Sequence, residues 1–340
     1  MNSTIFALDL AKHVIQAHWV EAETGEICRQ TLKRGKVLEF FVNRSPAVIA
    51  MEACGSAHHW ARKLMTLGHE VRLIAPQFVR PFVKTNKTDA ADAQAIWETA
   101  QRPGMKFVPV KSVGQQSVLA LHRIRSLLVK MRTMQVNELR GLLYEFGADI
   151  PQGRVKGMNC MPKELERLED ILPAMVIETM REQIKRIEAL DKDIADTEKK
   201  LAAWKKDDQS ATKLADIPGI GLLTATAAVA TVGDAKAFSS GREFAAFMGL
   251  VPRQSGTGGR VKLLGISKRG DVYLRTLLIP AARAVSRCQK EREPWLEKLL
   301  ARRPVNVAVV ALANKMARTI WALLPITVRM NSDLTLVDSL

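Results

Sequence analysis

Four acidic residues in the first hundred positions have the chemistry and the spacing to bind metal ions together. Asp9 and Glu52 each end a short apolar segment typical of a strand, where a charge beside a core is costly unless it is paired or bound. Asp89 and Asp92 are three residues apart at the expected start of a helix, so both lie on one helical face. Mg²⁺ prefers carboxylate oxygens, and two-metal phosphoryl-transfer sites gather several of them. We therefore predict a Mg²⁺ site for phosphodiester chemistry, the alternative for each single residue being a strand or helix cap.

The segment 252–262, rich in glycine and in basic residues, carries two hydroxyl groups, on Ser255 and Thr257. A serine oxygen can attack phosphorus if it is exposed and flanked by charges that stabilise the pentavalent state. The alternative is a loop that only holds phosphate. The cations expected to contact nucleic-acid phosphates are Arg253, Arg260, Lys262, Lys268 and Arg269.

A second glycine motif, Ile217-Pro-Gly-Ile-Gly, has the pattern of a helix-hairpin-helix turn. Gly219 and Gly221 would let backbone N–H groups approach a phosphate at a helix N-terminus, a contact that does not read sequence. The alternative is an ordinary tight turn between two helices.

Charge points to a polyanionic partner. The 340 residues include 51 Lys and Arg against 35 Asp and Glu, a net charge of +16, and residues 211–340 alone carry 19 against 9. Such a surface favours nucleic acid, the alternative being a basic face that keeps the protein in solution. The aromatic content of 5% argues against a protein that reads single strands by base stacking.

Other classes are excluded by the same survey. The four cysteines form no CxxC pair, so neither a zinc ribbon nor a disulfide framework is expected. Lys315 and Arg318 interrupt the longest apolar stretch, which argues against a membrane span. The sequence begins without the features of a secretory signal, so a cytoplasmic, nucleoid-associated bacterial protein is expected.

The elements that must position these residues fall into two kinds. The first hundred residues are expected to form a mixed α/β sheet, with one helix that Ser56 caps and another that starts at Asp89. Its strands are expected over 4–8, 13–20, 47–51 and 71–74. Two long antiparallel helices, a hairpin or coiled coil, are expected over 115–146 and 163–206. The last third is expected to be mainly helical, with 252–270 as a loop and helices over 222–230, 271–290 and 304–324.

Six sequence blocks together resemble one family, the insertion-sequence transposases related to the Piv and MooV DNA invertases, some of which are guided by a bridge RNA. The resemblance covers nearly the whole chain. The N-terminal blocks are FALDLAKH, MEACGSAHHWARKL and KTDAADA. The C-terminal blocks are IPGIGLLTA, FAAFMGLVPRQ and GGRVKLLGISKRGDVYLRTLL. The start Asp9-Leu-Ala-Lys12 also resembles the phosphate loop of sugar-kinase-like ATPases, but no matching second loop follows.

The family resemblance implies an RNase H-like, RuvC-like N-terminal domain in which the four acids form a tetrad of metal ligands. It also implies a C-terminal serine that forms a covalent phosphoserine link to cleaved DNA, in a composite site shared between subunits. Relatives often have two adjacent hydroxyl residues before Gly-Gly, whereas here Gly256 separates Ser255 from Thr257. We assign Ser255 as the nucleophile because the family uses serine and its unbranched hydroxyl is less hindered, with Thr257 as the alternative.

We therefore expect three domains: an RNase H-like catalytic domain over 1–110, a helical hairpin for dimerisation over 111–208, and a transposase domain with the helix-hairpin-helix over 209–340. The expected function is Mg²⁺-dependent transposition or site-specific recombination by a dimer or tetramer that binds donor DNA, target DNA and a bridge RNA. Two alternatives stay open: a Holliday-junction-resolving endonuclease that uses water, and a non-catalytic nucleic-acid-binding scaffold.

Overall fold

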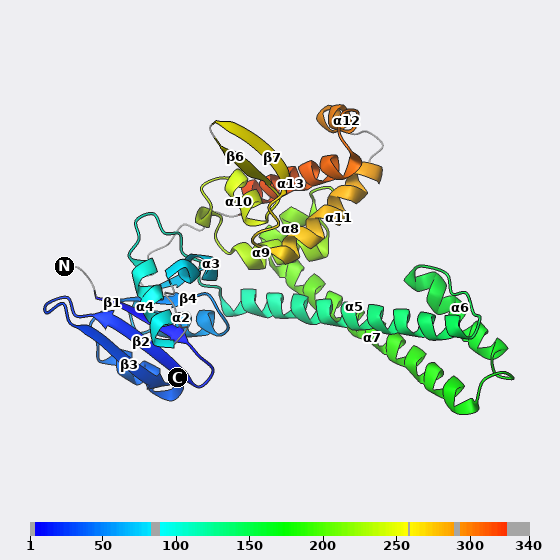
Figure 1. The fold of residues 1–340 in the computed structure, drawn as a ribbon, viewed down its shortest axis with the longest axis horizontal. Coiled ribbons are helices and arrows are strands. Elements are labelled where there is room, and N and C mark those ends of the chain that lie inside the picture. The colour runs from blue at the N-terminus through cyan, green and yellow to red at the C-terminus, as the bar shows by residue number, and fades with distance from the viewer. Residues whose placement is uncertain (1–3, 83–88, 258, 289–292, 325–340) are drawn as a thin grey trace. The chain divides into compact units, whose positions relative to one another are not determined.

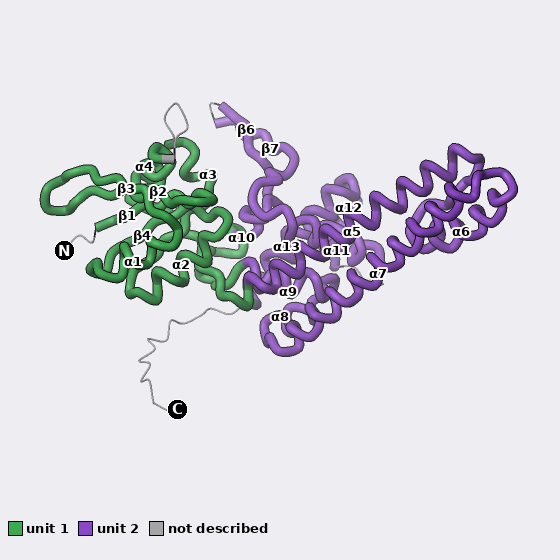
Figure 2. The backbone as a smooth tube through the Cα atoms, turned by 90° about the horizontal axis from the view of Figure 1, so that it is seen from below, with its two compact units in different colours: residues 1–115, 232–243, 324–340 green, residues 116–231, 244–323 purple. Residues whose placement is uncertain are grey.

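The computed structural model describes residues 4–82, 89–257, 259–288 and 293–324, coloured along the chain in Figure 1. The described residues group into two compact units, shown in Figure 2: unit 1 within 1–115, 232–243 and 324–340, and unit 2 within 116–231 and 244–323. The domain boundary predicted at 110 lies close to the end of the first segment of unit 1. The boundary predicted at 208 falls inside unit 2.

Unit 1 is built on a five-stranded mixed sheet with the order β3-β2-β1-β4-β5. Its strands are β1 (Ile5–Leu10), β2 (Val14–Val20), β3 (Ile27–Lys33), β4 (Val48–Glu52) and β5 (Glu70–Ile74). β2 pairs antiparallel with β1 and β3, while β4 is parallel to β1 and β5. The four predicted strands are confirmed. β3 was not predicted, because most of its side chains are exposed and it lacks the apolar alternation of a half-buried strand.

Helices cover both faces of this sheet. The helical segments of unit 1 are η1 (Arg34–Lys36), α1 (Val37–Val42), α2 (Ala57–Met65), α3 (Pro76–Val79), η2 (Arg80–Phe82), α4 (Asp89–Ala100) and η3 (Ala235–Ala237). On one face, Leu8 and Met51 join a core with α1 and α2. On the other face, Ala7 and Ala50 pack with α3 and α4. Successive strand residues point to opposite faces, so each residue's position along the strand decides which layer it meets.

The start of α2 differs from the prediction that Ser56 caps the helix. Ser56 has a left-handed backbone, with φ 69°, and its side chain makes no capping hydrogen bond. Its hydroxyl instead lies 3.2 Å from Nη2 of Arg34. The serine was predicted from its type and position, but a side-chain cap requires an extended backbone at that residue.

Unit 2 contains the predicted antiparallel helical hairpin. Its arms are α5 (Val113–Glu145), whose first residues belong to unit 1, and α7 (Ala174–Asp207), with α6 (Arg154–Arg167) between them. Arg125 bonds Glu198 at 2.6 Å and Arg132 bonds Asp191 at 2.7 Å, so a step forward along α5 is a step backward along α7. The helix predicted over 163–206 is in fact two helices, because helical geometry is interrupted between Arg167 and Ala174. Pro173 lies in this interruption and disfavours helical geometry in the residue before it.

The rest of the helical part follows the predicted order with additions. Its helices are α8 (Gln209–Ala215), α9 (Leu222–Val232), α10 (Gly241–Phe247), α11 (Val272–Cys288), α12 (Pro294–Leu300) and α13 (Val305–Leu323). The predicted loop over 252–270 is wrong: β6 (Pro252–Thr257) and β7 (Arg260–Ile266) form an antiparallel hairpin there. Its glycines suggested a loop, but Gly259 serves the turn, with φ +81°, while Val261 and Ile266 favour a strand.

None of the helices in the described part of the chain combines the length and apolarity that a membrane span requires.

Candidate functional site

The side chains of Asp9 and Glu52 project from the same face of the sheet, at the same end of their strands. β1 and β4 are parallel and register Ala7 with Ala50, so the two acids occupy the matching positions two residues further along. They share the side of Ala7 and Ala50, which is the side covered by α4. Both acids are half-buried. The fold therefore brings together two of the four predicted acids, which lie 43 positions apart in the sequence.

Helix α4 runs antiparallel to β1. The Trp97 indole Nε1 donates to the carbonyl oxygen of Ile5 at 3.1 Å, which places the later part of α4 beside the start of β1. The first turn of α4 therefore lies toward the other end of that strand, where Asp9 stands. Asp92 is half-buried there, on the same side of the helix as the sheet-facing Ala95 and Ile96. Asp89 begins the helix, and its side chain lies outside the described residues.

Ligation by the whole tetrad stays a prediction. Among the side chains that the structure describes, no three or more of His, Cys, Asp and Glu are grouped closely enough to hold a metal ion. Asp92 thus does not complete a three-carboxylate group with the two strand-end acids in this arrangement. What the structure does place together is a pair of hard oxygen donors on neighbouring strands, and carboxylate oxygens suit Mg²⁺.

The pKa of the Cys54 thiol reflects the negative charge at this end of the sheet. Burial raises the pKa of Cys54 above its ordinary value, and the charges of Glu52 and then Asp9 raise it further. Arg34 acts weakly in the opposite direction. A neutral thiol is therefore favoured next to the acid pair, and one arginine brings positive charge to the same place.

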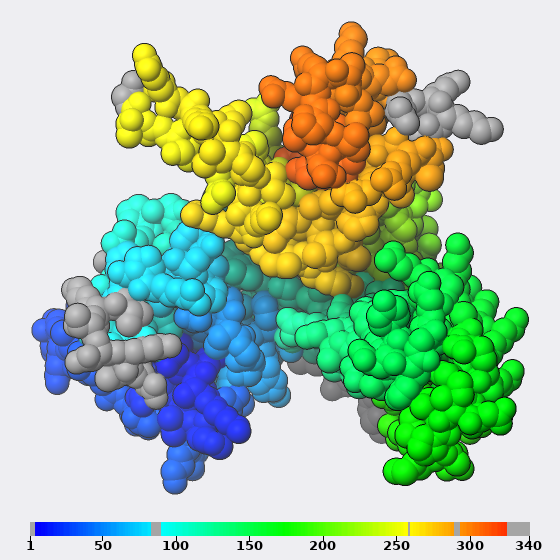
Figure 3. All heavy atoms as spheres, turned by 45° about the vertical axis from the view of Figure 1, so that its right-hand side comes forward, coloured from blue at the N-terminus to red at the C-terminus, as the bar shows by residue number. Residues whose placement is uncertain are grey.

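The predicted nucleophiles lie on the β6–β7 hairpin, drawn in yellow where it projects from its unit in Figure 3. Ser255 is registered with Lys262 and Thr257 with Arg260. Directly opposed residues in an antiparallel pair present their side chains on one face, with Cβ atoms about 5 Å apart. Every residue of β6 is exposed. The structure therefore gives each hydroxyl a cationic neighbour, a pairing that the sequence alone did not establish.

The hairpin also accounts for the glycine that separates the two hydroxyls. A Cβ built on Gly256 would lie 2.1 Å from the carbonyl oxygen of Arg260 and 3.0 Å from its carbonyl carbon. No side chain fits at that distance without moving the backbone of the partner strand. At this position, the hairpin of this chain admits only glycine.

A buried arginine that the sequence analysis missed holds the base of the hairpin. Arg275, only 8% exposed, donates from Nη1 to the carbonyl oxygens of Met248 at 2.7 Å and Arg269 at 3.2 Å. The two backbone segments cross closely here, since a Cβ on Gly270 would lie 1.7 Å from the carbonyl oxygen of Phe247. The sequence did contain a signal for this residue, because Arg275 lies between Leu274 and Leu278, which are one helical turn apart and are both buried in α11.

The predicted helix-hairpin-helix turn connects α8 to α9. Gly219 has φ +83°, and a Cβ there would lie 2.5 Å from Val285 Cγ2 and 3.0 Å from the Met316 methyl carbon. Close packing against α11 and α13 thus explains this glycine, whereas a Cβ on Gly221 would meet open space. Binding of phosphate by the turn stays a prediction.

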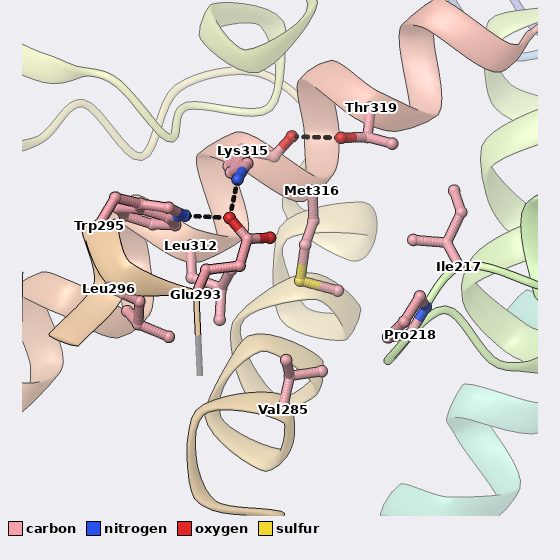
Figure 4. A pocket seen from close by; sticks show the side chains of 10 residues that line it. All are labelled: Ile217, Pro218, Val285, Glu293, Trp295, Leu296, Leu312, Lys315, Met316 and Thr319. Carbon is pink, nitrogen blue, oxygen red and sulfur yellow. Dashed lines mark hydrogen bonds and ion pairs between the residues drawn. The ribbon is translucent and has the colours of Figure 1, made fainter. Parts of the chain in front are cut away.

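A pocket of about 240 Å³ lies beside this turn (Figure 4). Ile217 of the turn lines it together with residues of α11, α12 and α13. Trp295 and Lys315 both point toward the carboxylate of Glu293 and bond it, and the Lys315 ammonium lies 4.9 Å from the centre of the Trp295 ring. The polar groups of the pocket thus bind one another.

Two family descriptions match the chain. Residues 6–147, which contain the acid pair, match a DEDD transposase domain described as "Transposase". Residues 211–296, which contain the hairpin, match the "Transposase IS116/IS110/IS902 family". The DEDD domain implies an RNase H-like fold and a nuclease site that depends on a divalent metal.

Similar proteins cover almost the whole chain. A "Probable family 20 transposase" of Pseudomonas aeruginosa is 51% identical over 329 residues, 95% of this chain and 97% of that protein. The "Transposase for insertion sequence element IS1111A" of Coxiella burnetii is 42% identical over 94% of this chain and 89% of its own length. A "Pilin gene-inverting protein" of Moraxella bovis is 24% identical over 84% of each chain.

Proposed function

Because the chain belongs to the IS116/IS110/IS902 family of transposases, which cleave and rejoin DNA, we propose that it does so through a Mg²⁺-dependent acidic centre and a covalent phosphoserine intermediate. The main support is the placement of Asp9 and Glu52 on one sheet face at neighbouring strand ends. The position of Ser255 opposite Lys262 on an exposed hairpin supports the covalent step.

In the acidic centre, Asp9 and Glu52 would hold the cation, and Asp89 and Asp92 of the first turn of α4 would supply further carboxylate ligands. Their carboxylate oxygens are the donors that Mg²⁺ prefers. Mg²⁺ bound there would polarise the scissile phosphate as a Lewis acid. The half-buried setting of the strand-end pair keeps these side chains in restricted positions, which favours a preorganised site.

On the hairpin, the Ser255 hydroxyl oxygen forms a bond to phosphorus while the bond from phosphorus to one deoxyribose oxygen breaks. The serine loses its proton, and the departing deoxyribose oxygen takes up a proton and becomes a hydroxyl group. Lys262 stabilises the added negative charge of the pentavalent state. Rejoining reverses these steps with another DNA hydroxyl, so the energy of the phosphodiester is conserved and ATP is not required.

Nucleic-acid binding is assigned to the same half of the chain. Arg253, Arg260 and Lys262 are exposed on the hairpin, and Lys268 and Arg269 are exposed at its base. These cations would bind backbone phosphates of donor and target DNA, so removing each should reduce the salt dependence of binding. The bridge RNA follows from the family resemblance, and sequencing RNA that copurifies with the protein tests it against the flanking DNA of the insertion sequence.

A test of the covalent step uses end-labelled DNA and denaturing gels to detect protein–DNA adduct. Wild type and Thr257→Ala should form adduct, and Ser255→Ala should not. Adduct that survives in Ser255→Ala and disappears in Thr257→Ala would assign Thr257 instead. Undiminished cleavage without adduct in both variants would identify a water-using endonuclease, and binding without cleavage in every preparation would identify a scaffold.

A mixing experiment tests whether subunits share the site. Asp9→Asn and Ser255→Ala subunits should each be inactive alone. If an oligomer combines the acids of one subunit with the serine of another, mixing the two variants should restore part of the cleavage. No restoration after subunit exchange, verified with differently tagged chains, would contradict a composite site.

A further inference from the structure

One arginine contacts both loops that follow the acid-bearing strands. Arg34 Nη1 donates to the carbonyl oxygen of Ala11, in the loop after β1, at 2.9 Å. Its Nη2 lies 3.2 Å from the Ser56 hydroxyl oxygen, in the loop after β4. The guanidinium carbon is 5.4 Å from the centre of the Trp60 ring, which is itself buried. Arg34 therefore connects the ends of two parallel strands from a third segment, η1.

The contact at Ser56 is made from an unfavourable backbone conformation. Ser56 has φ 69°, which for a non-glycine residue costs about 1 kcal/mol. Such conformations persist where surrounding contacts hold them, and they concentrate at functional sites. The Ser56 side chain makes no capping bond to α2, although its carbonyl oxygen accepts from the Trp60 N–H at 3.1 Å. The hydroxyl is thus available to the guanidinium of Arg34.

We infer that Arg34 is a positioning residue for the acidic centre. It holds the loops that follow Asp9 and Glu52 at a fixed distance from each other, so that the two carboxylates can bind one divalent cation. This inference rests on the proposed function. A planar guanidinium can donate to two acceptors while stacking on an aromatic ring, whereas an ammonium group cannot do all three. Outer groups that orient metal ligands typically contribute a factor of about 10 to 100 in metal affinity.

Binding of Mn²⁺ alone to the full-length protein, measured by electron paramagnetic resonance, tests this role without relying on activity. We expect Arg34→Met and Arg34→Lys to raise the dissociation constant of the Asp9-dependent Mn²⁺ site by about tenfold or more. Binding to DNA without metal should stay within about twofold of wild type, because the arginine is assigned to the loops and not to phosphate.

Arg44→Met is the matched control. Arg44 is also a half-buried arginine of unit 1, and its guanidinium lies 4.2 Å from the centre of the Phe40 ring and 5.1 Å from that of Phe6, near the start of β1. Its loss removes a stacked guanidinium of the same kind away from the two loops. We expect Mn²⁺ binding of Arg44→Met to match wild type.

Ser56→Gly separates positioning from general stability. Glycine adopts positive φ without strain, so the variant should melt no lower than wild type. It also lacks the hydroxyl that accepts from Arg34, so its Mn²⁺ dissociation constant should rise severalfold. A role of Arg34 in folding alone would not weaken metal binding in a variant whose stability is unchanged or higher.

The outcomes distinguish this inference from the function on which it rests. If Asp9→Asn leaves Mn²⁺ binding unchanged, the proposed metal centre is wrong. If Asp9→Asn abolishes binding while both Arg34 variants and Ser56→Gly bind as wild type, the centre stands and the positioning role is overturned. If the Arg34 variants lose DNA affinity with unaltered Mn²⁺ binding, Arg34 is a phosphate contact, and the inference is equally wrong.

Discussion

Gly256 lies against the backbone of Arg260 so closely that a single added carbon would stand 2.1 Å from the Arg260 carbonyl oxygen. The two residues belong to opposite strands of the hairpin, and Gly256 sits directly between the two candidate nucleophiles. The spacing of those hydroxyls is therefore tied to a backbone approach that only glycine permits. The pairing of Ser255 with Lys262 depends on the same register.

Replacing Gly256 by alanine should disrupt the hairpin and, with it, DNA cleavage. The added methyl group forces the strands apart, and a misplacement of about 1 Å at a reacting group can cost about 100-fold in rate. Because the hairpin is exposed, the melting temperature should change little. Single-turnover cleavage measures the effect. Gly259→Asn is the control, since a Cβ there meets open space and asparagine tolerates positive φ. If Gly256→Ala cleaved DNA at the wild-type rate, the role assigned to the close contact between Gly256 and Arg260 would be contradicted.

Replacing Arg275 by methionine should destabilise the helical unit. The change removes two charge-assisted hydrogen bonds, one to the buried carbonyl oxygen of Met248 and one to the part-buried carbonyl oxygen of Arg269. The Met248 carbonyl oxygen becomes a buried acceptor without this donor. We expect a loss of about 3 kcal/mol in the free energy of unfolding, measured with urea. Arg283→Met on the same helix is the control, because Arg283 is exposed and its loss should cost less than about 0.5 kcal/mol. Equal free energies of unfolding for the two variants would refute the stabilising role of the Arg275 hydrogen bonds.

A buried histidine should make the stability of the protein depend on pH. His122 is 1% exposed, between Tyr273 at 2.9 Å and Thr226 at 3.0 Å. Thr226 donates to the Leu222 carbonyl oxygen at 2.7 Å, so its hydroxyl accepts from His122 Nε2–H and the Tyr273 hydroxyl donates to Nδ1. The neutral imidazole fits this arrangement. Burial, and next the charge of Arg125, lower the pKa of His122 from 6.5 to about 4.

The sign of the effect follows from the lowered pKa. Between pH 6.5 and 4 the unfolded chain binds this proton and the folded chain does not, so stability is full above pH 6.5 and falls as the solution is acidified. For His122 the free energy of unfolding should drop by about 2 kcal/mol between pH 7.5 and 5. His122→Gln should flatten this dependence in urea unfolding. Burial also lowers the pKa of His58 to about 4, so the double variant with His58→Gln should be flatter still. An unaltered slope in both variants would refute the assignment.

Removing the metal or one strand-end acid should abolish cleavage. Chelation by EDTA should stop the reaction and added Mg²⁺ should restore it, because the carboxylates alone do not polarise the phosphate. Asp9→Asn should lower the single-turnover rate by about 100-fold or more while leaving DNA binding intact. Glu39→Gln removes an exposed carboxylate of the same unit and should keep full activity. Retained cleavage in Asp9→Asn would contradict the acidic centre.

The sequence by itself determined the order and type of most elements. Alternating or fully apolar runs predicted β1, β2, β4 and β5, since burial imposes a period on the side chains, and the long helical periods predicted α5 and most of α7. Elements without an apolar period, such as the exposed strands β3, β6 and β7, were missed or taken as loops.

Membership in a transposase family was likewise readable from local blocks of sequence, and the comparisons confirmed it. Tertiary structure alone decided which distant residues become neighbours. Parallel pairing sets Asp9 beside Glu52, and hairpin register sets Ser255 opposite Lys262. Arg34 and Arg275 acquire their roles from carbonyl groups on other segments. A side-chain type at one position carries no information about the backbone that will later approach it, so these contacts had to be seen in the folded chain.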